Sequence, residues 1–220
     1  MRGLLSKIKE PVSCLTHLFG AILSVVAMAL MVYEAAALQK PVHALSFAIF
    51  GLSLILLYSA SSAYHMFNLS EKGTLRLKKI DHMMIYVLIA GTYTPFCLIA
   101  LDGTVKWVLF GTIWSLAVIG ILFKLLWINA PRWISVAFYL FMGWLAVFTI
   151  PDLIGSVPDG AIAWTVTGGL SYSVGAVIYG IKKPDPFPEV FGFHEIWHLF
   201  VLGGSFSHFW VMYRYLMYIG

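Results

Sequence analysis

Three short polar motifs interrupt a chain that is otherwise strongly apolar, and they hold the side chains best suited to chemistry. They are Ser61-x-x-x-His65, Asp81-His82 and His194-x-x-x-His198. Imidazole, carboxylate and hydroxyl groups together are typical of sites in which a metal ion activates water. The three motifs are therefore candidates for parts of one metal site.

The spacing within the motifs predicts which residue takes which role. His194 and His198 are four residues apart, so on a helix both imidazoles project from one face. Together with His65 they would supply three nitrogens to a tetrahedral Zn2+ and leave one position open for water, as in a catalytic zinc site. Asp81 could then hold or deprotonate that water as a general base. Ser61 could hydrogen-bond a substrate carbonyl or the developing oxyanion.

The segment from His194 to His198 also has the pattern H-E-x-x-H, which is found in zinc metalloproteases. An intramembrane protease of that kind needs a further metal ligand downstream on another segment. Only 22 residues follow His198, all in the same expected helix, which disfavours a peptidase. Glu195 is expected instead to be a polar partner for a neighbouring helix or a lipid headgroup.

The sequence gives less reason to place the remaining histidines and Glu195 in the metal site. His17, His82 and Glu195 are candidates to support the metal ligands from outside, with polar packing between helices as the alternative for His17. His43 and His208 fall toward the opposite side of the membrane. We expect each of these two to hydrogen-bond a neighbouring helix.

Seven stretches are long and apolar enough to position these motifs in a membrane, since a helix needs about 20 mainly apolar residues to cross a bilayer. They cover about 12–38, 42–67, 81–101, 107–128, 133–150, 161–181 and 193–219. The motifs lie at the end of the second stretch and at the beginning of the third and seventh. An all-α bundle of seven transmembrane helices, forming a single domain over residues 1–220, therefore brings all three to one face of the membrane.

The composition excludes a water-soluble domain. The 220 residues are 60% hydrophobic and 11% charged, whereas soluble domains carry roughly 25% charged residues. The net charge of +4 does not indicate nucleic-acid binding, because the basic residues follow the expected membrane topology. Eleven of the basic residues fall on the side of the membrane where the N-terminus is expected: Arg2, Lys7, Lys9, Lys72, Arg76, Lys78, Lys79, Lys124, Arg132, Lys182 and Lys183.

Only three basic residues, Lys40, Lys106 and Arg214, fall on the other side. This asymmetry predicts a cytoplasmic N-terminus and, with seven helices, a C-terminus outside. The candidate metal site then lies near the cytoplasmic face. The basic segment Glu71–Lys79 is expected to be a loop, lying along an anionic inner leaflet or simply following the charge rule.

Longer stretches around the motifs resemble the bacterial haemolysin III proteins, the prokaryotic branch of the progestin and adipoQ receptor family. The resemblance extends from about Glu10 to Tyr218, and its specific blocks are Ile89–Phe96 (IAGTYTPF) and Phe191–His198 (FGFHEIWH). The other matching stretches are Thr16-His17, Ser61-x-x-Tyr64-His65, Asp81-His82 and Ser207-His208.

This resemblance implies a seven-helix protein of the bacterial cytoplasmic membrane, with an intramembrane zinc on His65, His194 and His198. The family's water-holding aspartate falls on Asp81 and its motif serine on Ser61. The adiponectin receptor branch is associated with ceramidase-like hydrolysis of lipid amides, which makes a membrane lipid the expected partner and substrate.

Three functions remain open at this point. The first is a zinc-dependent hydrolase of a lipid amide or similar membrane substrate. The second is a pore-forming cytolysin, as the family name suggests, although no charged ring suited to a channel is found in the sequence. The third is a non-catalytic receptor or regulator of membrane state, in which zinc only joins the second and seventh helices. The sequence leaves the oligomeric state open.

Overall fold

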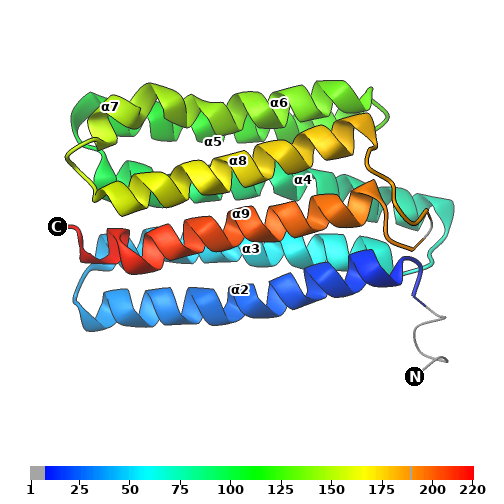
Figure 1. The fold of residues 1–220 in the computed structure, drawn as a ribbon, viewed down its shortest axis with the longest axis horizontal. Helices are drawn as coiled ribbons and strands as arrows, with labels where there is room; N and C mark the ends of the chain where they lie inside the picture. The colour runs from blue at the N-terminus through cyan, green and yellow to red at the C-terminus, as the bar shows by residue number, and fades with distance from the viewer. Residues whose placement is uncertain (1–7, 189) are drawn as a thin grey trace.

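A computed structural model of the protein describes residues 8–188 and 190–220, which form a bundle of long helices packed side by side (Figure 1). Neighbours along the chain pack against each other, as α2 does on α3, α3 on α4 and α8 on α9. The helices are α2 (Pro11–Ala37), α3 (Pro41–Met66), α4 (Glu71–Pro95), α5 (Gly103–Leu126), α6 (Arg132–Trp144), α7 (Ile150–Leu153), α8 (Asp159–Ile181) and α9 (Phe193–Arg214).

Six of the described helical segments are long and apolar enough to cross a membrane. They are α2, α3, α4 with its continuation to Ala100, α5, the run from Arg132 to Leu153, and α8. The chain is therefore a multi-pass membrane protein. The seventh expected span, α9, has 22 residues but does not reach the same hydropathy, because histidines, serines and Glu195 dilute its apolar residues. It lies between α8 and α2 (Figure 1), where other helices can cover these polar groups.

The beginning of α4 differs from the sequence-based expectation. The expectation of a loop over Glu71–Lys79 was wrong, because these residues form the first turns of α4. Ser70 caps the helix by accepting a hydrogen bond from the Gly73 amide at 3.4 Å. Glu71 follows in the first turn, where a negative charge is favourable for the helix dipole. The basic segment is therefore a helical extension of the third span.

Two of the spans change helix type along their length. Helix α4 passes into a π-helical turn, η1 (Phe96–Ala100), directly after Pro95, whose ring nitrogen cannot donate a hydrogen bond. Between α6 and α7 the chain forms a 3-10 turn, η2 (Leu145–Thr149). The Tyr93 hydroxyl lies 2.8 and 2.7 Å from the carbonyl oxygens of Met142 and Gly143, and it accepts from the Ala146 amide at 2.8 Å. One buried side chain from α4 thus satisfies the backbone groups that the break exposes.

The described basic residues expected on the cytoplasmic side lie at one end of the bundle, where α2 begins, α3 meets α4, α5 meets α6 and α8 meets α9 (Figure 1). Arg2 and Lys7 lie outside the described residues. The short 3-10 helix η3 (Leu216–Tyr218) follows α9 at the opposite end. Which end faces the cytoplasm remains a prediction from the charge asymmetry.

Cysteine labelling tests this orientation. With a cytoplasmic N-terminus, Asp102→Cys lies outside and Lys182→Cys inside, and both positions are exposed. The native thiols, Cys14 and Cys97, are buried and give little background. In intact cells an impermeant maleimide should label Asp102→Cys, whereas Lys182→Cys should react only after the membrane is opened. The reverse pattern would show that the bundle is inverted.

Candidate metal centre

Three histidines from two helices that are far apart in the sequence meet at the end of the bundle where the basic residues gather. His65 lies in the last turn of α3, whereas His194 and His198 lie in the first two turns of α9. One metal-binding atom from each of the three lies within 4.8 Å of the others. The Nε2 atoms of His65 and His194 are 3.2 Å apart, and the ring centroids of His194 and His198 are 4.6 Å apart. His65 and His198 are almost completely buried.

This spacing fits a tetrahedral metal ion. Zinc–nitrogen bonds of 2.0–2.1 Å at tetrahedral angles place ligand nitrogens about 3.3 Å apart. The Nε2–Nε2 separation of 3.2 Å between His65 and His194 agrees with that value. The three histidines could therefore hold a metal ion, and their donor type suits zinc.

Glu10 orients His65, a contact that sequence reasoning did not predict. Its carboxylate bonds the Nδ1 atom of His65, which turns Nε2 toward the other two histidines. Two backbone bonds, from the Glu10 amide to the His65 carbonyl at 3.0 Å and from the Lys9 amide to the Met66 carbonyl at 3.3 Å, hold this segment against the end of α3. The bond with His65 lowers the pKa of Glu10 to about 2, so the carboxylate is charged at neutral pH. Carboxylates that orient ligand histidines in this way are common around metal sites.

Helix α2 orients His198 from the other side. The Thr16 hydroxyl lies 3.2 Å from the Nδ1 atom of His198. His17 stacks on the His198 ring, with centroids 3.5 Å apart and planes 10° apart. His17 therefore contacts a member of the cluster, although neither of its own ring nitrogens has a hydrogen-bond partner among the described residues. Its supporting role for the metal ligands remains a prediction.

Glu195 takes part in helix packing and capping. It accepts a hydrogen bond from the Ser13 hydroxyl of α2 at 2.5 Å and another from the Gly192 amide at 2.8 Å. These bonds cap the beginning of α9 and join it to α2. This is the role of a polar partner for a neighbouring helix that was expected from the sequence.

Asp81, His82 and Ser61 lie beside the cluster. Asp81 and Ser61 are buried, and both line the same cavity as His194 and His198. The His82 Nδ1 atom lies 2.8 Å from the Lys78 carbonyl oxygen and 3.7 Å from an Asp81 carboxylate oxygen. The arrangement thus adds an acid and a hydroxyl to the space next to the histidines. The catalytic roles of Asp81 and Ser61 remain predictions.

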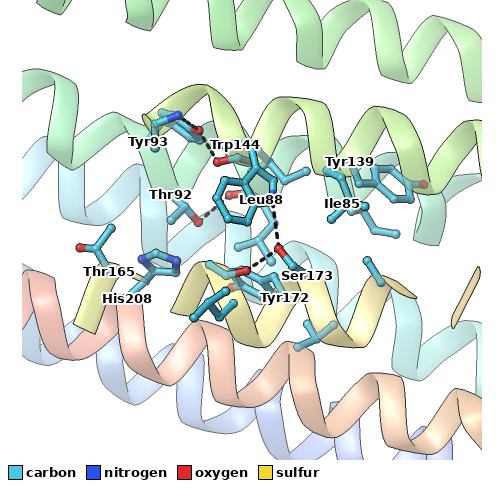
Figure 2. A pocket seen from close by; sticks show the side chains of 18 of the residues that line it. Ile85, Leu88, Thr92, Tyr93, Tyr139, Trp144, Thr165, Tyr172, Ser173 and His208 are labelled. Atoms are coloured by element: carbon cyan, nitrogen blue, oxygen red, sulfur yellow. Dashed lines mark hydrogen bonds between the residues drawn. The ribbon is translucent and has the colours of Figure 1, made fainter. Parts of the chain in front are cut away.

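The cavity has a volume of about 250 Å3 and extends from the histidine cluster far along the bundle. Its walls come mainly from α3, α4, α6, α8 and α9, with further residues from α2, η1, α5, η2 and α7, and most of its lining side chains are apolar. Figure 2 shows the part around Leu88, Tyr139 and Trp144, where the Trp144 indole donates to the Ser173 hydroxyl at 3.1 Å. The candidate site is therefore the polar end of a long apolar space.

His43 and His208, the two histidines expected toward the opposite side of the membrane, differ in their hydrogen bonding. The His43 ring bonds the Ile219 carbonyl oxygen at 2.9 Å, as expected for a histidine that joins neighbouring segments. The same expectation was wrong for His208, because its Nδ1 atom has no hydrogen-bond partner among the described residues. His208 lines the cavity instead.

Comparisons with known proteins agree over nearly the whole chain. The family model described as haemolysin-III related matches residues 5–209. The chain is 40% identical to "Hemolysin-3 homolog" of Bacillus subtilis (strain 168), over 94% of this chain and 95% of that protein. It is 37% identical to "Hemolysin-3" of Bacillus cereus, over 95% and 92%. At 27% identity it resembles the human "Monocyte to macrophage differentiation factor", over 93% and 83%.

Removal of Glu10 should weaken metal binding without removing a ligand. Loss of a carboxylate that orients a ligand histidine typically costs about 10–100-fold in metal affinity. We expect Glu10→Ala to lose its metal at correspondingly lower chelator concentration than the unmodified protein, measured by metal content after chelator challenge. Glu34→Ala is the matched control, because Glu34 lies at the opposite end of α2 and bonds Tyr218. Equal retention by all three proteins would contradict this role for Glu10.

Proposed function

The chain belongs to the haemolysin-III-related family, and from that premise we propose that it is a zinc-dependent hydrolase of an amide or similar bond in a membrane lipid. The observation that carries the proposal is the meeting of three imidazoles, from α3 and α9, at one end of an apolar cavity that also holds Asp81 and Ser61. An apolar cavity suits an acyl chain, and the polar end suits the bond to be cleaved.

Zinc bound by His65, His194 and His198 would lower the pKa of a coordinated water to about 7. Asp81 would hold that water and take its proton as attack begins. The Ser61 hydroxyl would donate a hydrogen bond to the oxygen of the carbonyl under attack, where negative charge develops. Asp81 would then return the proton to the nitrogen of the amide as the carbon–nitrogen bond breaks, which releases an amine and a carboxylic acid. Glu10 and Thr16 hold the rings of His65 and His198 in place throughout.

Access to the cavity supports a lipid as the substrate. Several of its lining residues are also exposed on the outer surface of the bundle: Gly143, Trp144 and Val147 on one side, and Val166 and Leu170 of α8 on the other. The cavity therefore reaches the surface between α6 and α8, at a level where lipid chains would surround the protein. A substrate entering here would come from the bilayer rather than from water.

The names of the two bacterial relatives favour a second candidate, a pore-forming cytolysin. A conducting pore needs a polar or charged lining, which replaces the hydration shell of the passing ion. The cavity has polar groups at one end and mostly apolar walls beyond it. If the protein is a cytolysin, dye release from liposomes that contain it should be unaffected by removal of the metal-site histidines. A receptor with a purely structural zinc would instead show neither hydrolysis nor leakage.

Asp81→Asn separates catalysis from metal binding. The substitution keeps the size of the side chain but removes the group that accepts the proton, and general bases contribute about 100- to 10,000-fold to rate. We expect the variant to keep its metal and to lose at least about 100-fold in the hydrolysis of a fluorescent N-acyl amide lipid.

Asp152→Asn is the control for this experiment. Asp152 is an exposed aspartate of α7 that does not line the cavity, so its substitution should leave hydrolysis unchanged. Full hydrolysis by Asp81→Asn, with the metal retained, would exclude Asp81 as the base.

A further inference from the structure

Helices α6 and α8 both line the cavity, and two hydrogen bonds between their described residues join them. The Arg132 guanidinium, from the first residue of α6, donates to the Tyr179 carbonyl oxygen at 3.1 Å. The Trp144 indole, from the last residue of α6, donates to the Ser173 hydroxyl at 3.1 Å (Figure 2). The two bonds therefore hold α6 against α8 at opposite ends of α6.

The surroundings of the two bonds differ. The Arg132 guanidinium also lies over the rings of Tyr179 and Phe193, at 4.5 and 5.4 Å from their centroids. Trp144 and Ser173 instead line the cavity, and Trp144 remains 49% exposed. Side-chain hydrogen bonds between membrane helices are individually weak. The contact with α8 is therefore less firmly held at Trp144 than at Arg132.

Two glycines beside the Trp144 bond are explained neither by backbone conformation nor by close packing. Gly143 of α6 and Gly169 of α8 both line the cavity, and neither has a positive φ. A Cβ atom added at either position would meet no neighbouring segment within 4 Å, whereas at Gly168 it would lie 2.8 Å from the His208 ring. Glycine within a helix lowers its stability. Here the two glycines leave open space in the wall that α6 and α8 share.

The surface around these glycines is apolar and lies within the membrane-spanning part of the chain. Val147, Val166 and Leu170 line the cavity, and they are 43%, 45% and 48% exposed. They lie inside the apolar segments Arg132–Leu153 and Asp159–Ile181. The surrounding medium at this level is therefore the hydrocarbon of the bilayer. An acyl chain can pass here without the loss of hydrogen bonds, whereas a polar headgroup cannot.

We propose that Gly143 and Gly169 border a lateral mouth of the cavity and that the Trp144–Ser173 hydrogen bond is a latch across it. The acyl chain of a bilayer lipid enters when this bond breaks. The closed state is favoured at rest, because a broken latch leaves the indole N–H without a partner in a hydrocarbon environment. The proposal rests on the proposed function only in that the entering chain belongs to the substrate.

Time-resolved photolabelling of the purified protein in phosphatidylcholine nanodiscs tests the mouth and the latch. The probe is stearate with a photoreactive diazirine near the end of its chain, activated by a light flash at increasing times after mixing. Mass spectrometry then measures the label on Leu88 and Thr92, which are buried and line the cavity. Label on Val25 and Val26 of α2, which are about half exposed and do not line the cavity, reports the probe in the surrounding bilayer.

Leucine at either glycine tests the mouth. Because the space at Gly143 and Gly169 is open, Gly143→Leu and Gly169→Leu should fold normally and fill the mouth. Each should lose most of the early label on Leu88 and Thr92 while keeping the label on α2. Gly111→Leu is the control, because Gly111 of α5 has equally open space and does not line the cavity.

Loss of the latch should have the opposite effect on the rate. Trp144→Phe removes the donor and Ser173→Ala removes the acceptor, and in each the probe should reach Leu88 about three- to fifteenfold faster, the range expected for one interhelical hydrogen bond. The double variant should be no faster than the faster single variant, because both substitutions remove the same bond. Trp133→Phe on α6 and Thr167→Val on α8 are the controls, since both residues are exposed and neither lines the cavity.

Each failure has a distinct meaning. An unchanged rate in Gly143→Leu and Gly169→Leu would overturn the mouth. A reduced rate in these two variants, with an unchanged rate in Trp144→Phe and Ser173→Ala, would overturn the latch alone. Absence of label from Leu88 in the unmodified protein would overturn the acyl-chain cavity and the mouth together. Entry that depends on the mouth, in a protein that hydrolyses no amide lipid, would support the mouth and overturn only the hydrolase.

Discussion

The rest of the structure depends on the meeting of three imidazoles, two of them buried, at the end of α3 and the beginning of α9. Polar groups within a membrane are costly unless they are paired, and lipid acyl chains cannot pair them. The rings must therefore be supported by protein, and two of the supports come from the beginning of α2 and the residue before it: Glu10 bonds His65 and Thr16 bonds His198. Ser13 of α2 also bonds Glu195 at the start of α9. This requirement explains why α9, which carries His194, Glu195 and His198, lies between α8 and α2.

Much of the site could be predicted from the sequence, because spacing and membrane depth are local properties. The four-residue spacing of His194 and His198 and the position of His65 at the end of an apolar stretch were enough to bring the three together. Glu10 could not be found in this way, because it contacts His65 across 55 residues and lies just before a helix, where an acidic residue has many other uses. The unpaired state of His208 likewise depends on what the opposing helices offer.

In the fold, too, the features that depend on local sequence could be predicted, whereas those that depend on tertiary contacts could not. Apolar stretches predicted the six spans well, whereas the early beginning of α4 depends on a cap at Ser70 and the break in α6 depends on Tyr93 from another helix. The cavity is a further consequence of tertiary packing. It joins the polar end of the bundle, where Asp81 and Ser61 lie, to a mostly apolar interior lined by residues of α6 and α8. Helix α9 takes part in both regions, because it contributes His198 to the polar end and His208 to the wall of the interior.

The most direct test of the central claim is zinc X-ray absorption spectroscopy on the purified protein, with metal content measured on the same sample. The account predicts one zinc per chain, bound by three imidazole nitrogens and one oxygen at about 2.0–2.1 Å. The oxygen would mark the open position that hydrolysis needs. A well-folded protein without metal, or a zinc with a fourth ligand from the protein, would contradict it.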